Sequence, residues 1–216
     1  DLIYITSLTG KASQALPYIT RKAKQLIKKK GIRIVVNPGT SQLESGVAIL
    51  RAALPDIDIL LLNADEMKLL MSSLKPRFFK SNTTFLIPGG PLLLQEKLLY
   101  NTISFTLVDY FKEIFSYGVK RIVVTNGKEG VYIATIDTLY FHPALPGPVI
   151  NTVGAGDAFG SCFTAMLALG LHIKDAIRAG VIQAQSVISY QDAKTGLLSI
   201  PTLEKNLKAI DTTLLK

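Results

Sequence analysis

Short apolar runs that do not alternate in polarity constrain the fold of this chain more than any other feature of its sequence. Such runs occupy residues 2–6, 32–36, 57–62 and 121–125, and longer amphipathic segments separate the first three. A strand that is apolar at nearly every position is buried on both faces, as in a parallel sheet between two layers of helices. We therefore predict a doubly wound α/β fold with a mostly parallel sheet and helices on both faces.

The remaining segments fit this fold. A chain of 216 residues suits one domain, so residues 1–216 are predicted to form a single domain. Residues 75–104 are less regular, with a Pro-Gly-Gly-Pro break. Two further short strands are expected over residues 131–135 and 139–142. Helical periodicity is present in seven segments: residues 17–30, 43–54, 64–73, 107–117, 155–169, 173–190 and 201–210.

Composition excludes several classes of protein. Cys162 is the one cysteine, so no disulfide forms within the chain, and with His142 and His172 it makes no metal-ligand pattern. The sequence has no apolar run of the ~18 residues that a membrane helix needs, so no membrane partner is expected. The cytoplasm is the expected compartment.

The net charge of +8 is concentrated in residues 21–30. The apolar residues of this segment share one helical face, which favours a solvated outer face for the cations. Binding to nucleic acid is the alternative. No aromatic-interleaved basic stripe or zinc finger supports that alternative, so the sequence argues against it.

The stretch INTVGAGDAFG at residues 150–160 carries the chemistry. A helix that begins near Ala155 directs free backbone N–H groups outwards, and glycines let a phosphoryl group approach them. Asp157 at the end of such a loop is placed to take a proton from an attacking hydroxyl. The plainer interpretation is a glycine turn followed by an acid in the first turn of a helix.

A dinucleotide-binding loop is the main rival among glycine motifs. Gly154, Gly156 and Gly160 resemble its pattern, but the third glycine comes one position late. The loop also lies far from the first strand, so an NAD-binding protein is disfavoured.

Three motifs together resemble the ribokinase-like (PfkB) carbohydrate kinases. Residues 151–159 match the signature DTxGAGDxF at every position except the first. Residues 63–66 resemble the NxxE motif, and residues 125–130 resemble the T-x-G-x-x-G turn of that family. The three motifs occur in the order in which the family has them, and the resemblance covers nearly the whole chain.

The resemblance implies a role for each motif. Asp157 would be the catalytic base, and the amides of Gly154, Ala155 and Gly156 would form an anion hole. ATP and Mg²⁺ would be the cofactors, with the metal held largely through water. The residues implied on the nucleotide and metal side are Asn63 and Glu66 for Mg²⁺ and the phosphates, Thr125, Gly127 and Gly130 for the nucleotide, and Gln183 for the adenine.

Two positions depart from the family pattern. Asn151 stands where relatives usually have the aspartate of a monovalent-cation site, and a neutral amide makes cation activation doubtful. The first strand resembles one from the middle of family members, so an N-terminal segment with part of the acceptor surface is expected to be missing. The mean hydropathy of +0.32 is consistent with that expectation.

The function implied is ATP-dependent phosphorylation of a sugar or nucleoside hydroxyl. The alternative is a non-catalytic nucleotide-binding remnant, or a subunit that needs a partner to complete its acceptor site. A homo-oligomer or a complementing N-terminal segment would be that partner.

Overall fold

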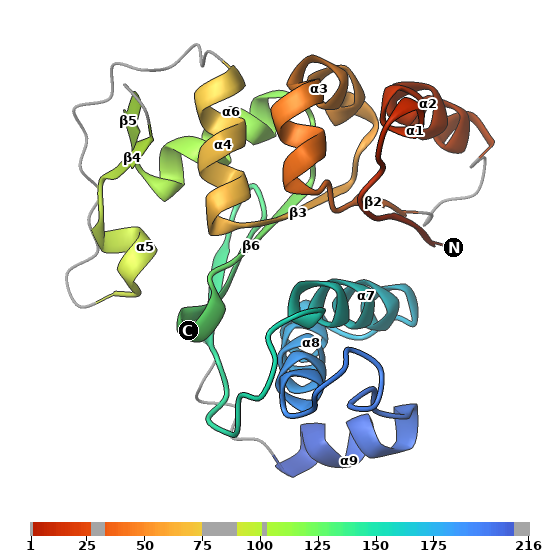
Figure 1. Cartoon of the computed structure of the whole chain (residues 1–216), viewed down its shortest axis with the longest axis vertical. Coiled ribbons are helices and arrows are strands. Elements are labelled where there is room, and N and C mark those ends of the chain that lie inside the picture. Colours follow the sequence, from red (N-terminus) through yellow and green to blue (C-terminus); the bar gives the residue numbers. More distant parts are fainter. Residues whose placement is uncertain (1, 27–32, 75–89, 101–102, 210–216) are drawn as a thin grey trace. The chain divides into compact units, whose positions relative to one another are not determined.

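The structure, a computed structural model, describes residues 2–26, 33–74, 90–100 and 103–209 (Figure 1). The chain falls into two compact units. The sheet unit comprises Ile3–Val124 and Ile133–Leu139, and the helical unit comprises Asp1–Leu2, Thr125–Tyr132 and Tyr140–Lys216. The single domain expected over residues 1–216 stays a prediction.

A six-stranded sheet has the order β1-β2-β3-β6-β7-β8. Strands β2 and β3 run parallel, with Val35 opposite Ile59 and Val36 opposite Leu60, and all four residues are buried. The mostly parallel sheet that the apolar runs predict is confirmed. Its strands are β1 (Leu2–Ile5), β2 (Arg33–Val36), β3 (Ile59–Asn63), β6 (Arg121–Thr125), β7 (Gly130–Ala134) and β8 (Leu139–Pro143).

Helices α3 and α4 pack side by side, and α6 lies on the same side of β2, β3 and β6 (Figure 1). Each buries an apolar stripe at helical spacing, as Met67, Leu70, Met71 and Leu74 show in α4. The α-helices described in the sheet unit are α1 (Lys11–Gln14), α2 (Leu16–Leu26), α3 (Thr40–Ala53), α4 (Ala64–Leu74), α5 (Leu92–Gln95) and α6 (Leu107–Ser116), and a 3-10 helix follows α3 at Leu54–Asp56.

The loop before β3 ties neighbouring strands together. The Asp58 carboxylate accepts a hydrogen bond from the Ile34 N–H (3.0 Å), and the Asp58 carbonyl accepts one from the Arg121 N–H (2.9 Å). Lys120 also pairs with the Asp58 carboxylate. One residue therefore links the starts of β2, β3 and β6.

Residues 75–104, which the sequence predicts to be less regular, contain short elements in their described part. They are helix α5 and the antiparallel pair β4 (Leu98–Tyr100) and β5 (Ile103–Phe105). Elements of three or four residues leave no periodicity to read, which explains why the sequence did not predict them.

The basic segment forms helix α2 as far as Leu26, and residues 27–30 lie outside the described part. Arg21 and Lys24 are directed to Asp56, at 4.0 and 3.2 Å. Both cations are largely exposed, so these pairs add little stability. Their position agrees with the solvated outer face predicted from the sequence.

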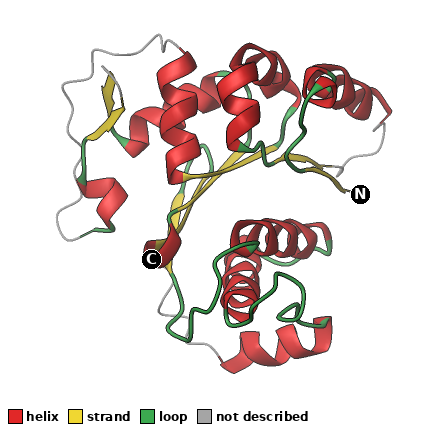
Figure 2. Cartoon of the chain, viewed as in Figure 1, coloured by secondary structure: helices red, strands yellow, loops and turns green. Residues whose placement is uncertain are grey.

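In the described part of the helical unit, three helices follow residue 154: α7 (Ala155–Ala168), α8 (Ile173–Ile188) and α9 (Ile200–Ala209) (Figure 2). Helices α7 and α8 approach closely where Gly180 faces Phe159, because a Cβ on Gly180 would lie 2.9 Å from the Phe159 ring. Phe159 also stacks on Phe163, with ring centroids 5.6 Å apart. Among the described helices, none has the length and apolar character needed to cross a bilayer.

Helix α6 begins with a reciprocal cap that gives a direct test of the sheet unit. Thr106 Oγ1 accepts a hydrogen bond from the Asp109 N–H, and Asp109 Oδ2 accepts one from the Thr106 N–H. Thr106→Ala is expected to lower the free energy of unfolding by about 1 kcal/mol, because it leaves a helix N–H without its acceptor. Thr106→Ser keeps the hydroxyl and should lose much less in the same denaturant titration. Equal losses in both variants would contradict the cap.

Candidate functional site

The glycine loop lies at the start of α7. Gly154 is the N-cap residue and has a φ of 84°, a left-handed conformation that favours glycine. A Cβ at Gly154 would lie 2.6 Å from the Cβ of Ala193, in the turn after α8. Glycine is therefore needed here for two reasons, the conformation of the loop and its close approach to that turn.

The free N–H groups predicted at this loop are partly present. Within the described part of the chain, the N–H groups of Gly154, Gly156 and Asp157 have no hydrogen-bond acceptor. The N–H of Ala155 differs, because it is directed to the Thr152 carbonyl at 3.3 Å. Its share in an anion hole stays a prediction.

Gly156 has no structural reason to be glycine. It is the second residue of α7, and a Cβ built on it would meet nothing within 4 Å. Glycine inside a helix destabilises it by about 0.5–1 kcal/mol relative to alanine. Open space over this backbone is what a ligand that approaches the N–H groups requires.

The Asp157 carboxylate is exposed and has no hydrogen-bond or ion-pair partner among the described residues. The backbone carbonyl of Asp157 accepts a hydrogen bond from Ser161 Oγ at 2.7 Å. Acidic side chains in the first turns of three other helices do have hydrogen-bond or ion-pair partners. Asp109 caps α6, Glu66 bonds to the Asn63 N–H, and Asp175 pairs with Arg178 at 3.0 Å. Asp157 makes no such bond, although it lies in the first turn of α7 after a glycine turn, as the plainer interpretation also predicts.

Asn63 and Glu66, in the sheet unit, form a reciprocal cap at the start of α4. The Asn63 N–H donates to Glu66 Oε2 (2.9 Å) and the Glu66 N–H donates to Asn63 Oδ1 (2.8 Å). Burial raises the pKa of the Tyr110 hydroxyl well above its ordinary value, and the Glu66 carboxylate adds to this rise. The structure brings Asn63 and Glu66 together at the end of β3.

The turn over residues 125–130 connects β6 to β7. The Asn126 N–H donates to the Gly130 carbonyl at 2.8 Å, which closes the turn. Gly130 has a φ of 130°, and a Cβ on it would lie 2.1 Å from the carbonyl oxygen of His142 in β8. Thr125 is the last residue of β6 and is half-buried, whereas Gly127 is exposed.

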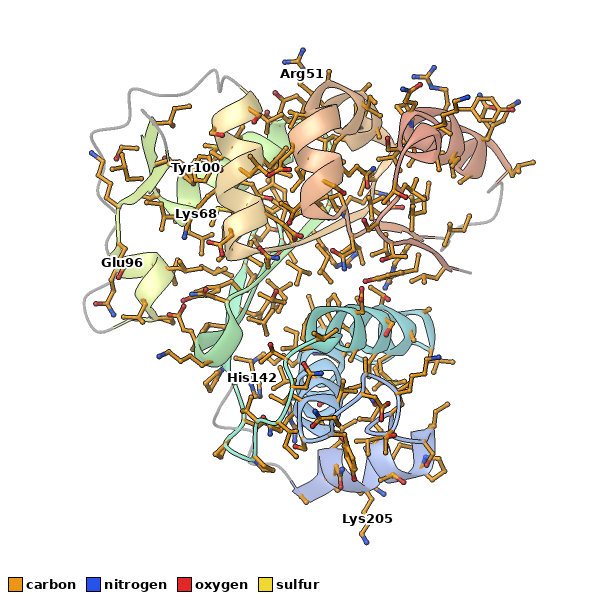
Figure 3. All side chains as sticks on the ribbon, in the orientation of Figure 1. Arg51, Lys68, Glu96, Tyr100, His142 and Lys205 are labelled. Atoms are coloured by element: carbon orange, nitrogen blue, oxygen red, sulfur yellow. The ribbon has the colours of Figure 1, made fainter. Side chains whose placement is uncertain are left out.

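His142 lies in β8 (Figure 3) and is fully buried, and its carbonyl oxygen faces Gly130 of this turn. Its Nδ1 bonds to the Pro143 carbonyl at 2.7 Å, so Nδ1 carries the proton and Nε2 is left as an acceptor. Burial lowers the pKa of His142, the hydrogen bond to Pro143 raises it, and the charge of Arg178 lowers it. His142 is held neutral as part of the support for the turn.

A cavity of about 310 Å³ lies in the helical unit between residues 145–148 and helix α8. The loop is fixed to the helix, because Gln185 Nε2 and Ser189 Oγ both donate to the Pro148 carbonyl. The sequence did not predict this cavity, although its prolines and glycine mark the loop. Its lining is Leu145, Pro146, Gly147, Pro148, Ile182, Gln185, Ser186, Ser189, Leu198, Asn206 and Ala209.

Gln183 is close to this cavity in sequence but does not line it. Its side chain is buried, and its Oε1 accepts a hydrogen bond from the Leu198 N–H at 3.4 Å. Leu198 itself is part of the cavity wall. Gln183 therefore supports the wall, and its direct contact with an adenine stays a prediction.

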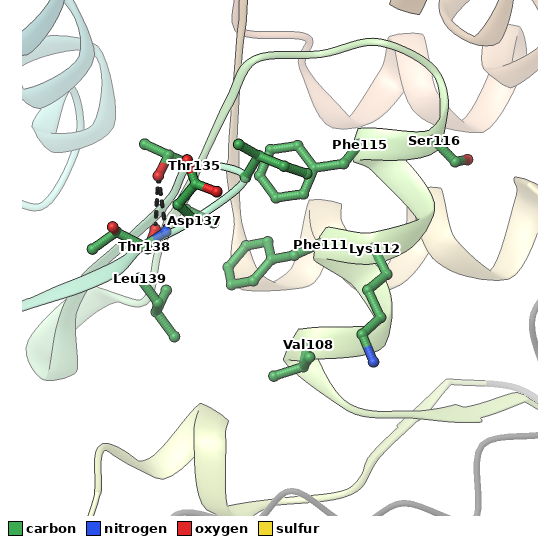
Figure 4. Close-up of a pocket in the computed structure, with 11 residues that line it drawn as sticks. Val108, Phe111, Lys112, Phe115, Ser116, Thr135, Asp137, Thr138 and Leu139 are labelled. Atoms are coloured by element: carbon green, nitrogen blue, oxygen red, sulfur yellow. Dashed lines mark hydrogen bonds between the residues drawn. The ribbon is translucent and has the colours of Figure 1, made fainter.

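A second cavity of about 510 Å³ lies in the sheet unit, between α6 and the tip of the β7–β8 hairpin. Phe111 and Phe115 face the hairpin tip there (Figure 4). Its lining includes none of the residues that the sequence assigns to the site.

Residues 1–200 match the family described as pfkB family carbohydrate kinase. The match covers most of the chain. The chain belongs to this family.

Three relatives illustrate the match. The chain is 33% identical to a ribokinase of Lactococcus lactis over 103 residues, which are 48% of the chain and 34% of that protein. It is 24% identical to a 1-phosphofructokinase of Bacillus subtilis over 192 residues, 88% of the chain and 53% of that protein. Its fold matches that of Arabidopsis thaliana ribokinase complexed with ribose and ATP, with a TM-score of 0.69 at 16% identity. This last match covers 96% of the chain and 55% of the plant protein.

The fold is therefore ribokinase-like. The chain spans between about a third and about half of the length of the relatives it matches, with 34%, 53% and 55% covered in the three above. The family fixes the class of the protein, and the site residues stay predictions.

The two glycines of the 125–130 turn give a matched pair for testing its geometry. Gly130→Ala is expected to lower stability by about 1–3 kcal/mol from backbone conformation alone, with a further loss from its overlap with His142. Gly127→Ala should be milder, because a Cβ there meets nothing within 4 Å. Thermal unfolding of both variants checks the order. A milder effect for Gly130→Ala would contradict the close approach of β8.

Proposed function

We propose that this chain carries the nucleotide and catalytic part of an ATP-dependent phosphotransferase whose acceptor is a hydroxyl of a sugar or nucleoside. The observation that carries the proposal is the pairing of an unpartnered, exposed Asp157 with open space over the Gly156 backbone. Family membership supports the same reaction class. The relatives named above include kinases of a sugar and of a sugar phosphate.

The proposed reaction uses the two features in one step. The acceptor oxygen attacks the γ-phosphorus of ATP, the bond from that phosphorus to the bridging oxygen breaks, and ADP leaves. The acceptor's proton passes to Asp157 as the new bond forms. The N–H groups of Gly154 and Gly156 donate to the oxygens of the transferred group, and Ala155 is proposed to join them.

The cavity beside α8 is proposed to hold the nucleobase of ATP. A volume of about 310 Å³ is at the lower end of the range for small-ligand pockets. Its apolar walls suit the faces of a planar ring, and Gln185, Ser186 and Asn206 offer polar atoms for its edge. Thr125, Gly127 and Gly130 are proposed to contact the nucleotide from the 125–130 turn, and Gln183 to contribute on the adenine side.

Asn63 and Glu66 are proposed to hold Mg²⁺ and the phosphates through water. Mg²⁺ binds one or two carboxylates together with substrate phosphates and keeps several waters. Among the described residues, no three His, Cys, Asp or Glu side chains gather into a complete metal site. The carboxylate and amide oxygens at the start of α4 fit a water-mediated ion, whose bound charge would neutralise the phosphates.

Replacing Asp157, the proposed base, tests proton transfer separately from ATP binding. Asp157→Asn is expected to lower turnover about 10²–10⁴-fold while leaving the fold and ATP binding intact, because only proton transfer is lost. ATP consumption with Mg²⁺ is measured across sugars, sugar phosphates and nucleosides, and binding is measured by calorimetry. The control is Asp137→Asn, which changes an exposed acid in the β7–β8 turn.

Near-normal turnover in Asp157→Asn would refute the assignment of the base. ATP binding without transfer to any acceptor in the unmodified chain would support the alternative, a nucleotide-binding subunit that needs a partner.

Gly156→Ala tests the open backbone. The substitution should raise stability by about 0.5–1 kcal/mol, because alanine is the better helix former and its Cβ has room. It should also weaken ATP-dependent turnover, because the methyl group occupies the approach to the N–H groups. Thermal unfolding and turnover are measured together. A more stable protein with unchanged turnover would show that no phosphoryl group approaches Gly156.

A further inference from the structure

The loop that leads into α7 is bound to the last turn of α8 and the residues after it. The N–H groups of Ile150 and Asn151 both donate to the Ile188 carbonyl, at 2.8 and 3.2 Å. The Asn151 side chain adds a further bond, from Nδ2 to the Gln191 carbonyl at 2.7 Å. The path of the chain into the glycine loop is thus fixed by contacts on both sides of Asn151.

The orientation of the Asn151 amide is determined by its two partners. Its Oδ1 accepts from the Val153 N–H at 3.0 Å, and a backbone N–H can only donate. The Gln191 carbonyl can only accept, so it requires the NH₂ end. The same side chain therefore supplies an acceptor to the glycine loop and a donor to the turn after α8.

The turn that receives this bond is itself well defined. The Asp192 carboxylate accepts from the N–H groups of Lys194 and Thr195, both at 2.8 Å, and from Thr195 Oγ1 at 2.7 Å. These bonds lower the pKa of Asp192 to about 2. Gly196 lies against α8 so closely that a Cβ would be 2.4 Å from the Ser186 carbonyl oxygen.

A monovalent cation, which the family resemblance implies near residue 151, does not fit this arrangement. A cation would need oxygen atoms directed at it, such as a carboxylate and the Gln191 carbonyl. The Asn151 NH₂ group instead points at that carbonyl and already satisfies it. An aspartate in the same position would place two acceptors face to face, and a cation between them would relieve the repulsion.

We propose that Asn151 takes the place of a monovalent cation: its amide holds the glycine loop against the turn after α8, so that activity requires no potassium. Asn151 is thus a positioning residue, which acts through the backbone of residues 151–154. The expected effect of Asn151 on turnover rests on the proposed phosphotransfer. The expected effect of Asn151 on the stability of the loop does not depend on that function.

The test compares the 216-residue chain with Asn151→Asp and Asn151→Ala. Each is assayed in buffer whose monovalent cation is choline and in KCl of the same ionic strength. The unmodified chain should have the same turnover and thermal midpoint in both buffers. Asn151→Asp should lose up to about a hundredfold in turnover in choline, because a misplaced loop can cost that much. KCl should restore the turnover of this variant and raise its thermal midpoint. Asn151→Ala should be impaired in both buffers alike.

Each other outcome has a definite meaning. Stimulation of the unmodified chain by KCl would overturn the proposal, and so would full activity of Asn151→Asp in choline. An Asn151→Asp protein that is unfolded in both buffers would also overturn it, because a cation could then not replace the amide. If no acceptor is phosphorylated by any of the proteins, the proposed function fails. The thermal midpoints alone then decide whether potassium stabilises only the aspartate variant.

Discussion

The close approach of the glycine loop to the turn after α8 is the contact on which the helical unit depends. Gly154 lies against Ala193 in a conformation that favours glycine, and Asn151 bonds to the carbonyl two residues before Ala193. Together these contacts hold the residues that precede α7 against that turn. The start of α7 in turn determines which N–H groups are free and where Asp157 is exposed.

The motif at Asn63 and Glu66 and the motif at Asp157 differ in how they combine a structural role with a proposed functional one. Asn63 and Glu66 cap α4 through their own backbones, so the order of that helix end and its proposed contacts with phosphate and metal depend on the same atoms. Asp157 contributes no such cap to α7. The Asp157 carboxylate is exposed and has no partner among the described residues, so it is open to contact with a ligand. This difference supports the proposal that Asp157 is the base.

The sequence predicted the described strands of the sheet and the long helices well, because apolar runs and helical periodicity reflect burial directly. It also identified the three motifs, since each consists of neighbouring residues. It did not predict α5 or the β4–β5 pair, which are too short to have a period. The cavity beside α8 was missed as well, because its walls come from residues 145–148, 182–189 and 198–209. Such a cavity has no local pattern in the sequence.

The sequence by itself determined the fold class and the family, and it predicted the residues that we propose for phosphoryl transfer, because these follow from burial patterns and from motifs of adjacent residues. The tertiary structure decided what each polar side chain does with its hydrogen bonds. It showed that Gln183 supports Leu198, that Ala155 directs its N–H to Thr152, and that Asn151 satisfies the Gln191 carbonyl. Each of these partners is chosen by folding, because a donor and an acceptor bond only when the chain brings them within about 3 Å.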